Sequence, residues 1–180
     1  MINKQLTQLA AAIGMATMMT ACGGDSSSSG GGGTTVAEGG NGFVVFPAAE
    51  SAGAIAVRSA TPRAAALTEY LYKTDGTSAG TSKIVDDNNN GFEVGRFGGG
   101  YMAELDGTFY YAGKDSSGDV ELWATDGTGA GTERVADIYA NGSAQPHNMV
   151  PAAGKLFMNA VVDQFGRELV VFDPVSSAHR

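Results

Sequence analysis

One serine of the sequence lies in a pattern that could do acyl-transfer chemistry. Residues 76–80 read G-T-S-A-G, which has the spacing of the G-x-S-x-G nucleophile elbow around Ser78. That chemistry needs a strand-to-helix turn, a histidine and an acid. The only histidines, His147 and His179, lie in a predicted loop and next to the end of the sequence. A similar stretch fifty-one residues later has Gly129 in place of the serine, so we predict no catalytic residue.

An acidic and amide-rich segment could bind a cation. Residues 86–91 read D-D-N-N-N-G and place oxygen-bearing side chains at alternate positions, as an EF-hand loop does. Asp86, Asn88 and Asn90 would be the ligands. The twelfth position of such a loop is Phe97 instead of a bidentate glutamate, so an ordinary turn is the competing interpretation. Calcium is the one cofactor that the sequence suggests, and we expect no other.

Further polar and aromatic side chains could act on a sugar or hold an ion. The segment D-S-S-G-D that begins at Asp115, followed by Glu121, is a second oxygen-rich turn. Glu104 and Asp106 are a carboxylate pair, and glycosidases hold two carboxyls at a defined separation across a cleft. Trp123 could stack on a sugar, although a tryptophan in a strand more often belongs to the packing. An enzyme acting on polysaccharide is therefore the alternative function.

A repeat of about fifty residues must position all of these side chains. Residues 121–132 read E-L-W-A-T-D-G-T-G-A-G-T, and residues 71–81 read L-Y-K-T-D-G-T-S-A-G-T. A third copy begins at Gly154 and loses the D-G-T triplet where Asp173 is followed by proline. Periods of forty to fifty residues are typical of propellers and solenoids. We predict units near 71–106, 107–153 and a degenerate 154–180, with no convincing unit in 43–67.

Each unit is predicted to consist of short strands and tight turns. T-F-Y-Y-A, V-E-L-W-A-T and E-R-V-A-D-I are rich in aromatic and branched residues, and Asp-Gly and Asn-Gly are strong turn signals. The predicted fold is all-β, a partial or open β-propeller-like array that leaves strand edges and blade faces uncovered. In its structural turns an aspartate accepts amide hydrogen bonds and a glycine takes a positive φ. The predicted turn residues are Asp75, Gly76, Thr77, Asp126, Gly127 and Thr128.

One of these stretches carries a family resemblance. Residues 121–138 read E-L-W-A-T-D-G-T-G-A-G-T-E-R-V-A-D-I and resemble the E-L-W-x-x-D-G-T repeat of bacterial surface and secreted proteins. The match is looser over 71–86 and fragmentary over 154–173. The resemblance implies a β-propeller-like fold, and members of this family usually have no assigned enzymatic activity. It favours a binding or structural module, either as a whole protein or as a fragment of a longer repeat protein.

The beginning of the sequence predicts a location. Lys4 precedes an apolar run at 9–19, which is the pattern of a secretory signal and is too short to span a bilayer. The run ends in M-T-A-C at Cys22, the only cysteine, and this resembles a bacterial lipoprotein signal peptide. The resemblance implies that residues 1–21 are removed and that Cys22 is lipidated. By resemblance to known lipoprotein sorting rules, glycine rather than aspartate at position 23 favours the outer membrane of the bacterial cell envelope.

The rest of the chain divides into a linker and one domain. Residues 22–42 are predicted as the lipidated cysteine and a disordered Gly/Ser-rich linker, because they offer almost no apolar surface to bury. Residues 43–180 are the predicted β-repeat domain. The net charge of -8 and the absence of a basic run in the sequence disfavour nucleic-acid binding. The expected partners are the membrane through the lipid anchor, further copies of the chain, or an envelope protein or glycan.

Overall fold

The protein is represented by a computed structural model in which only part of the chain is described. Each element of that part is a β-strand, which confirms the prediction of an all-β fold. The predicted signal peptide and Cys22 lie outside the described residues. Within the described part, no helix is long and apolar enough to cross a membrane. The described residues are 37–38, 42–51, 54–56, 68–95, 100–164, 166–176 and 178–179.

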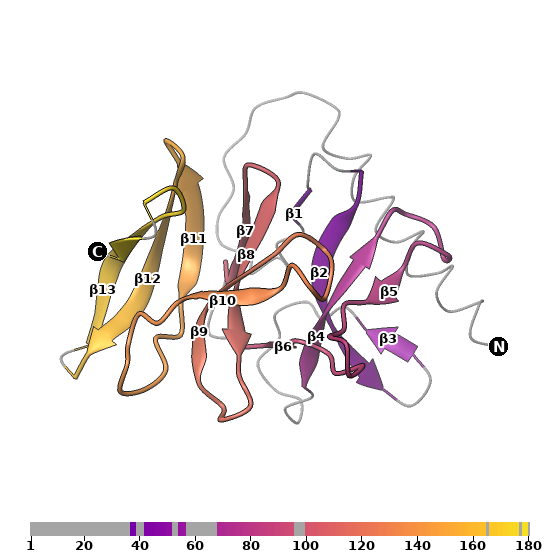
Figure 1. Cartoon of the computed structure of the whole chain (residues 1–180), viewed down its shortest axis with the longest axis horizontal. Helices are drawn as coiled ribbons and strands as arrows, with labels where there is room; N and C mark the ends of the chain where they lie inside the picture. The colour runs from indigo at the N-terminus through magenta and orange to yellow at the C-terminus, as the bar shows by residue number, and fades with distance from the viewer. Residues whose placement is uncertain are drawn as a thin grey trace, which may run out of the picture.

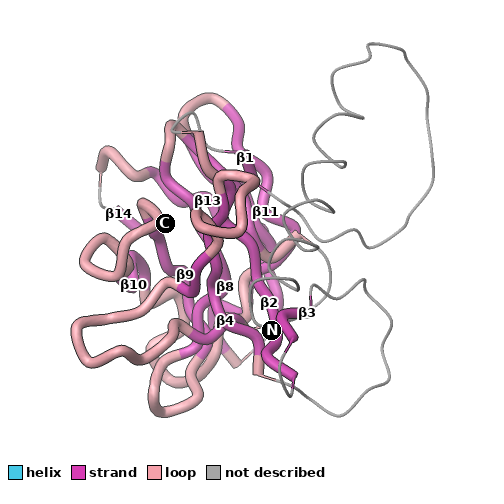
Figure 2. The backbone as a smooth tube through the Cα atoms, turned by 90° about the vertical axis from the view of Figure 1, so that its right-hand side faces the viewer, coloured by secondary structure: helices cyan, strands magenta, loops and turns pink. Residues whose placement is uncertain are grey.

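The strands form two antiparallel sheets, and in Figure 1 β3 and β5 of the larger sheet lie on one side of the molecule and β13 of the smaller sheet lies on the other. Figure 2 shows the same strands from the side, with the turns between them gathered at the ends of the strands. The larger sheet contains β1 (Ala37–Glu38), β2 (Val44–Ser51), β3 (Ala54–Ala56), β4 (Glu69–Thr74), β5 (Ser82–Lys83), β6 (Glu93–Val94), β7 (Met102–Leu105), β8 (Thr108–Lys114), β9 (Val120–Thr125) and β10 (Glu133–Ala136). The smaller sheet contains β11 (His147–Ala152), β12 (Lys155–Asp163), β13 (Gly166–Asp173) and β14 (Ala178–His179).

The strands group into three meanders, each a run of antiparallel neighbours. The second meander is β7-β8-β9-β10, the third is β11-β12-β13-β14, and the first is β1-β2-β4-β5 with β3 paired to the end of β2. The larger sheet joins the first two meanders because β6 pairs with both β4 and β8. The matching link to the third meander consists of single hydrogen bonds. The Gln145 amide donates to the Val120 carbonyl at 3.0 Å, and the Val161 amide donates to the Ala144 carbonyl at 2.8 Å.

The same register recurs in all three meanders. Phe109 pairs with Thr125 between β8 and β9, and Leu156 pairs with Phe172 between β12 and β13. In the first meander, Val44 pairs with Thr74 between β2 and β4. The third strands β4, β9 and β13 begin near 69, 120 and 166, so they follow the sequence repeat. The repeat is therefore one of strand pairing as well as of residue type.

Two features of the structure differ from the predicted boundaries. The interval 43–67, for which we predict no convincing unit, contains β2 and β3 of the first meander, and β2 occupies the place that β8 and β12 occupy in the other meanders. It escaped the sequence comparison because the connection from β2 to β4 is longer than the connection from β8 to β9, which shifts the repeat offset. The predicted linker 22–42 is also too long, because Ala37–Glu38 forms β1 and pairs with β2.

The core lies between the meanders. Rings from adjacent meanders meet there: the centroids of Phe43 and Phe109 are 5.7 Å apart, and those of Tyr110 and Phe172 are 5.6 Å apart. Such pairs contribute about 0.5 to 1.5 kcal/mol beyond the area they bury. The first strands of the meanders lie side by side, since β7 contacts both β1 and β11. The described strands do not close into a ring.

Candidate functional site

Both copies of T-D-G-T-x-A-G-T form the same turn between the third and fourth strands of a meander. In the second copy, Asp126 Oδ1 accepts hydrogen bonds from the Thr128 amide at 2.8 Å and hydroxyl at 2.7 Å. Asp75 accepts the same two bonds from Thr77 at 2.9 and 2.7 Å. The glycines after the aspartates, Gly76 and Gly127, have φ angles of 90° and 88°. Each predicted turn residue thus takes part in a backbone turn.

The second half of the motif closes the turn. The Thr74 and Thr81 hydroxyl oxygens lie 2.6 Å apart, and those of Thr125 and Thr132 lie 2.7 Å apart. These four side chains are buried. A β-carbon on Gly131 would lie 2.2 Å from the Asp126 carboxylate, which explains why A-G-T repeats as faithfully as D-G-T.

The motif aspartates are held ionised by their own turns. Hydrogen bonds from Thr77 lower the pKa of Asp75, and hydrogen bonds from Thr128 lower the pKa of Asp126. A carboxylate that is saturated in this way is a poor proton donor near neutral pH. The geometry therefore gives these residues a part in architecture and none in acid catalysis.

The predicted calcium ligands lie in the turn between Val85 and Gly91, which form an isolated bridge. Asp86 Oδ1 accepts hydrogen bonds from the Asn88 and Asn90 amides at 2.9 and 2.8 Å, and its other oxygen accepts one from the Asn90 side chain at 3.1 Å. These bonds, with the Asn90 amide first, lower the pKa of Asp86. No group of three or more His, Cys, Asp or Glu residues that could hold a metal ion occurs in the described part of the chain. The turn is complete without a cation, and calcium stays a prediction.

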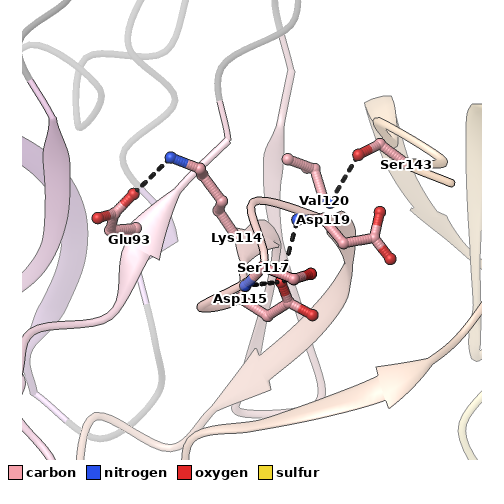
Figure 3. Close-up of polar contacts among 7 residues, drawn as sticks. All are labelled: Glu93, Lys114, Asp115, Ser117, Asp119, Val120 and Ser143. Atoms are coloured by element: carbon pink, nitrogen blue, oxygen red, sulfur yellow. Dashed lines mark hydrogen bonds and ion pairs between the residues drawn. The ribbon is translucent and has the colours of Figure 1, made fainter.

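The second oxygen-rich turn, between β8 and β9, is built in the same way (Figure 3). Asp115 Oδ1 accepts hydrogen bonds from the amide and hydroxyl of Ser117 and from the Asp119 amide, at 2.9, 2.6 and 3.0 Å. The Ser117 side chain is the main cause of the lowered pKa of Asp115. Beside the turn, Lys114 pairs with Glu93 at 2.9 Å, which ties the second meander to β6, the strand that joins it to the first.

Glu121 is a structural residue whose role sequence reasoning missed. The sequence groups it with the oxygen-rich turn, but its side chain is fully buried and its two oxygens accept hydrogen bonds from the Ile138 and Ala144 amides at 2.7 and 3.0 Å. Burial raises its pKa against the effect of these amides. The carboxylate fastens the loop that leads to the third meander. The sequence signal for a structural role is the Glu-Leu pair that recurs at Glu168 in the third meander. The signal does not reveal burial, because Glu168 is exposed.

The serine and histidine candidates do not have the setting of a catalytic triad. Ser78 lies in the turn between β4 and β5, so both of its flanking elements are strands, whereas the nucleophile elbow joins a strand to a helix. His147 Nδ1 lies 3.2 Å from the Gln145 carbonyl and 3.2 Å from an Arg167 nitrogen. The side chain of His179 is not among those described.

The carboxylate pair and the tryptophan also have structural settings. Glu104 accepts a hydrogen bond from the Gly107 amide in the hairpin turn between β7 and β8. Asp106 lies in the same turn with a φ of 52°, so the two carboxylates belong to one hairpin. Trp123 is half-buried and packs on Phe92, with ring centroids 6.3 Å apart.

Comparison with known proteins finds no family model, no curated protein and no solved structure that matches this chain. The resemblance to the E-L-W-x-x-D-G-T repeat therefore stays a prediction, and so does lipidation of Cys22. Among the described residues, the polar side chains of the repeated motif are engaged in turns. In the part of the chain that the structure describes, two exposed large apolar side chains, Val150 and Leu169, lie on the outer side of the third meander.

Proposed function

We propose that the protein is a lipid-anchored module of the bacterial outer membrane that binds or organises partners through an open β-propeller-like array. The observation that carries the module part is the identical turn in both motif copies, whose Asp75 and Asp126 carboxylates are used within the turn. A motif that recurs for a turn supports architecture over catalysis. The anchor part depends on the M-T-A-C sequence that ends at Cys22.

The propeller-like part of the proposal depends on the arrangement of the meanders. Three four-stranded meanders with one register, whose first strands lie side by side, are what three neighbouring blades would provide. Closed propellers typically have four to eight blades. The described strands are therefore fewer than a ring needs, and the proposed array is open.

Substitution of the predicted lipidation site tests the anchor. We expect Cys22→Ser to release the protein from the membrane fraction or to block processing, because stable anchoring needs more than one acyl chain and these chains would be attached here. Fractionation and mass spectrometry of the processed chain measure both effects. As a matched control, Ser27→Cys added to the Cys22→Ser variant supplies a cysteine outside the M-T-A-C context and should not restore the anchor. Normal cleavage with unchanged membrane association of Cys22→Ser would exclude the lipoprotein.

A further inference from the structure

The outer face of the third meander is apolar and uncovered. We propose that this face is the contact surface of a two-fold dimer of this chain. Strand pairing places its side chains together, since Val150 lies opposite Phe157, Phe157 opposite Val171, and Leu169 opposite Asn159. Val150 is 56% exposed and Leu169 is 68% exposed. Single exposed apolar residues are common on protein surfaces, but several on one sheet face mark a contact site.

The equivalent face of the second meander is buried against a neighbouring sheet. Tyr110, Leu122 and Ala124 occupy the positions in the second meander that Phe157, Leu169 and Val171 occupy in the third. All three residues of the second meander are at most 7% exposed. They are buried because the inner face of the third meander covers them, as the contact between the Tyr110 and Phe172 rings shows.

The first meander repeats this arrangement. Val45 and Leu71 are the counterparts of Phe157 and Leu169 there, and both are fully buried in the main core cluster. The equivalent face is thus covered by a β-sheet in two of the three meanders. The third meander keeps the apolar residue types without the cover, so we infer that another sheet packs on it.

A second copy of the chain can offer this same face. The large hydrophobic side chains that are exposed in the described residues are Val150, Leu169 and Val175, and the first two lie on the face. The first meander's opposite face cannot take part, because Phe46 and Tyr72 on it are already 0% and 3% exposed. Two copies therefore meet through identical surfaces, which is the self-complementary contact of a two-fold dimer. Sheet faces that pack in this way lie about 10 Å apart.

The charges on the face allow this approach although each chain carries a net charge of -8. Its centre is formed by Val150, Phe157, Leu169 and Val171 and contains no carboxylate. At one end, Asp173 is paired with Lys155. Two copies can therefore approach here without bringing unpaired carboxylates together. The proposal goes beyond the module function and does not depend on the anchor, because it concerns the folded domain.

The oligomeric state of the 180-residue chain tests the dimer. The chain is studied with Cys22→Ser, so that acylation cannot cause association, by size-exclusion chromatography with light scattering over a dilution series. We expect a dimer that dissociates on dilution, and Leu169→Asp should raise its dissociation constant by about tenfold or more, because a leucine loses its burial in the contact. Val175→Asp is the matched control, since Val175 is 91% exposed and follows β13, and it should leave the constant unchanged.

Mixing two charged variants shows whether the same faces meet. Leu169→Asp and Leu169→Lys should each raise the dissociation constant, and an equimolar mixture should associate more tightly than either variant alone, because the two faces then carry opposite charges. A monomeric parent chain at every concentration overturns the proposal, as does a Leu169→Asp variant that dimerises like the parent. A mixture that associates no more tightly than either variant alone overturns the two-fold contact. Melting curves confirm folding of each variant, and Val150→Asp serves as the second variant if Leu169→Asp is unfolded.

Discussion

The two copies of T-D-G-T-x-A-G-T have the same hydrogen bonds but different surroundings. The first turn, after β4, is open around Gly76: a β-carbon there would meet no atom within 4 Å. The second turn, after β9, is covered by the first meander, and a β-carbon on Gly127 would lie 2.5 Å from the Phe43 ring. The eight residues thus specify the turn, while the neighbouring meander determines how much change each copy tolerates.

The two copies differ at the fifth position of the motif, and the neighbouring meander explains this difference as well. Ser78 of the first copy is replaced by Gly129 in the second. A β-carbon on Gly129 would lie 1.9 Å from the Val85 carbonyl oxygen, so this position has room for no side chain. The substitution that argues against a nucleophilic serine in the sequence is explained by a close approach of backbones between meanders.

The largest effect is expected for valine at the second glycine. Gly127→Val should lower the free energy of unfolding by about 2 to 5 kcal/mol, because the positive φ costs about 1 to 2 kcal/mol and displacement of Phe43 adds about 1 to 3 kcal/mol. Gly76→Val should cost only the first of these, about 1 to 2 kcal/mol. Urea unfolding of both variants measures the difference. Equal losses would show that Phe43 does not restrict the second turn.

A smaller effect is expected at the serine and glycine pair. Gly129→Ala should destabilise the domain by about 1 to 3 kcal/mol, since the methyl group has to displace the Val85 carbonyl. Ser78→Ala should change stability by no more than about 0.5 kcal/mol, as is usual for a surface substitution. Thermal unfolding checks both values. A silent Gly129→Ala would contradict the close approach, and loss of a hydrolytic activity in Ser78→Ala would restore the enzyme hypothesis.

The turns and the third strands of the meanders were predictable because they depend on residues that are close together in the sequence. The D-G-T and A-G-T triplets identify turns through residue types that only a few backbone conformations accommodate, and the repeat offset gave the third strands of all three meanders. The first meander was missed because recognition needed the Val44 to Thr74 pairing, and strand pairing across a long connection leaves no short-range signal in the sequence.

The misassigned and hidden features depend on contacts between meanders. Glu121 resembles any other acidic residue near a turn in the sequence, and only the positions of Ile138 and Ala144 make it a buried acceptor of amide hydrogen bonds. The uncovered face of the third meander is equally invisible, because Leu169 matches the buried Leu122 in residue type. Sequence reveals the residue that repeats, whereas the structure reveals which copy is covered.

The smallest expected effect is a difference between the two motif aspartates in how their pKa values respond to salt. Hydrogen bonds from Thr128 are the main cause of the lowered pKa of Asp126, and Lys73 of β4 adds the smallest contribution, whereas the lowered pKa of Asp75 has only local causes beside desolvation. Both pKa values are lowered in the folded protein. Each carboxylate therefore contributes stability at pH values above about 3.9, the ordinary aspartate pKa, and this stability is lost as the pH falls through the folded pKa.

Carboxyl NMR titrations should therefore find both pKa values below about 3.9 at low salt. In about 1 M sodium chloride, where the Debye length is about 3 Å, the pKa of Asp126 should rise while that of Asp75 stays nearly constant. Lys73→Gln at low salt should reproduce the rise for Asp126 alone. If the two aspartates respond equally to salt, Lys73 has no role, and the two turns differ only in their packing against Phe43 and Val85. If Asp126 alone responds, the first meander acts on the second turn through charge as well as through contact.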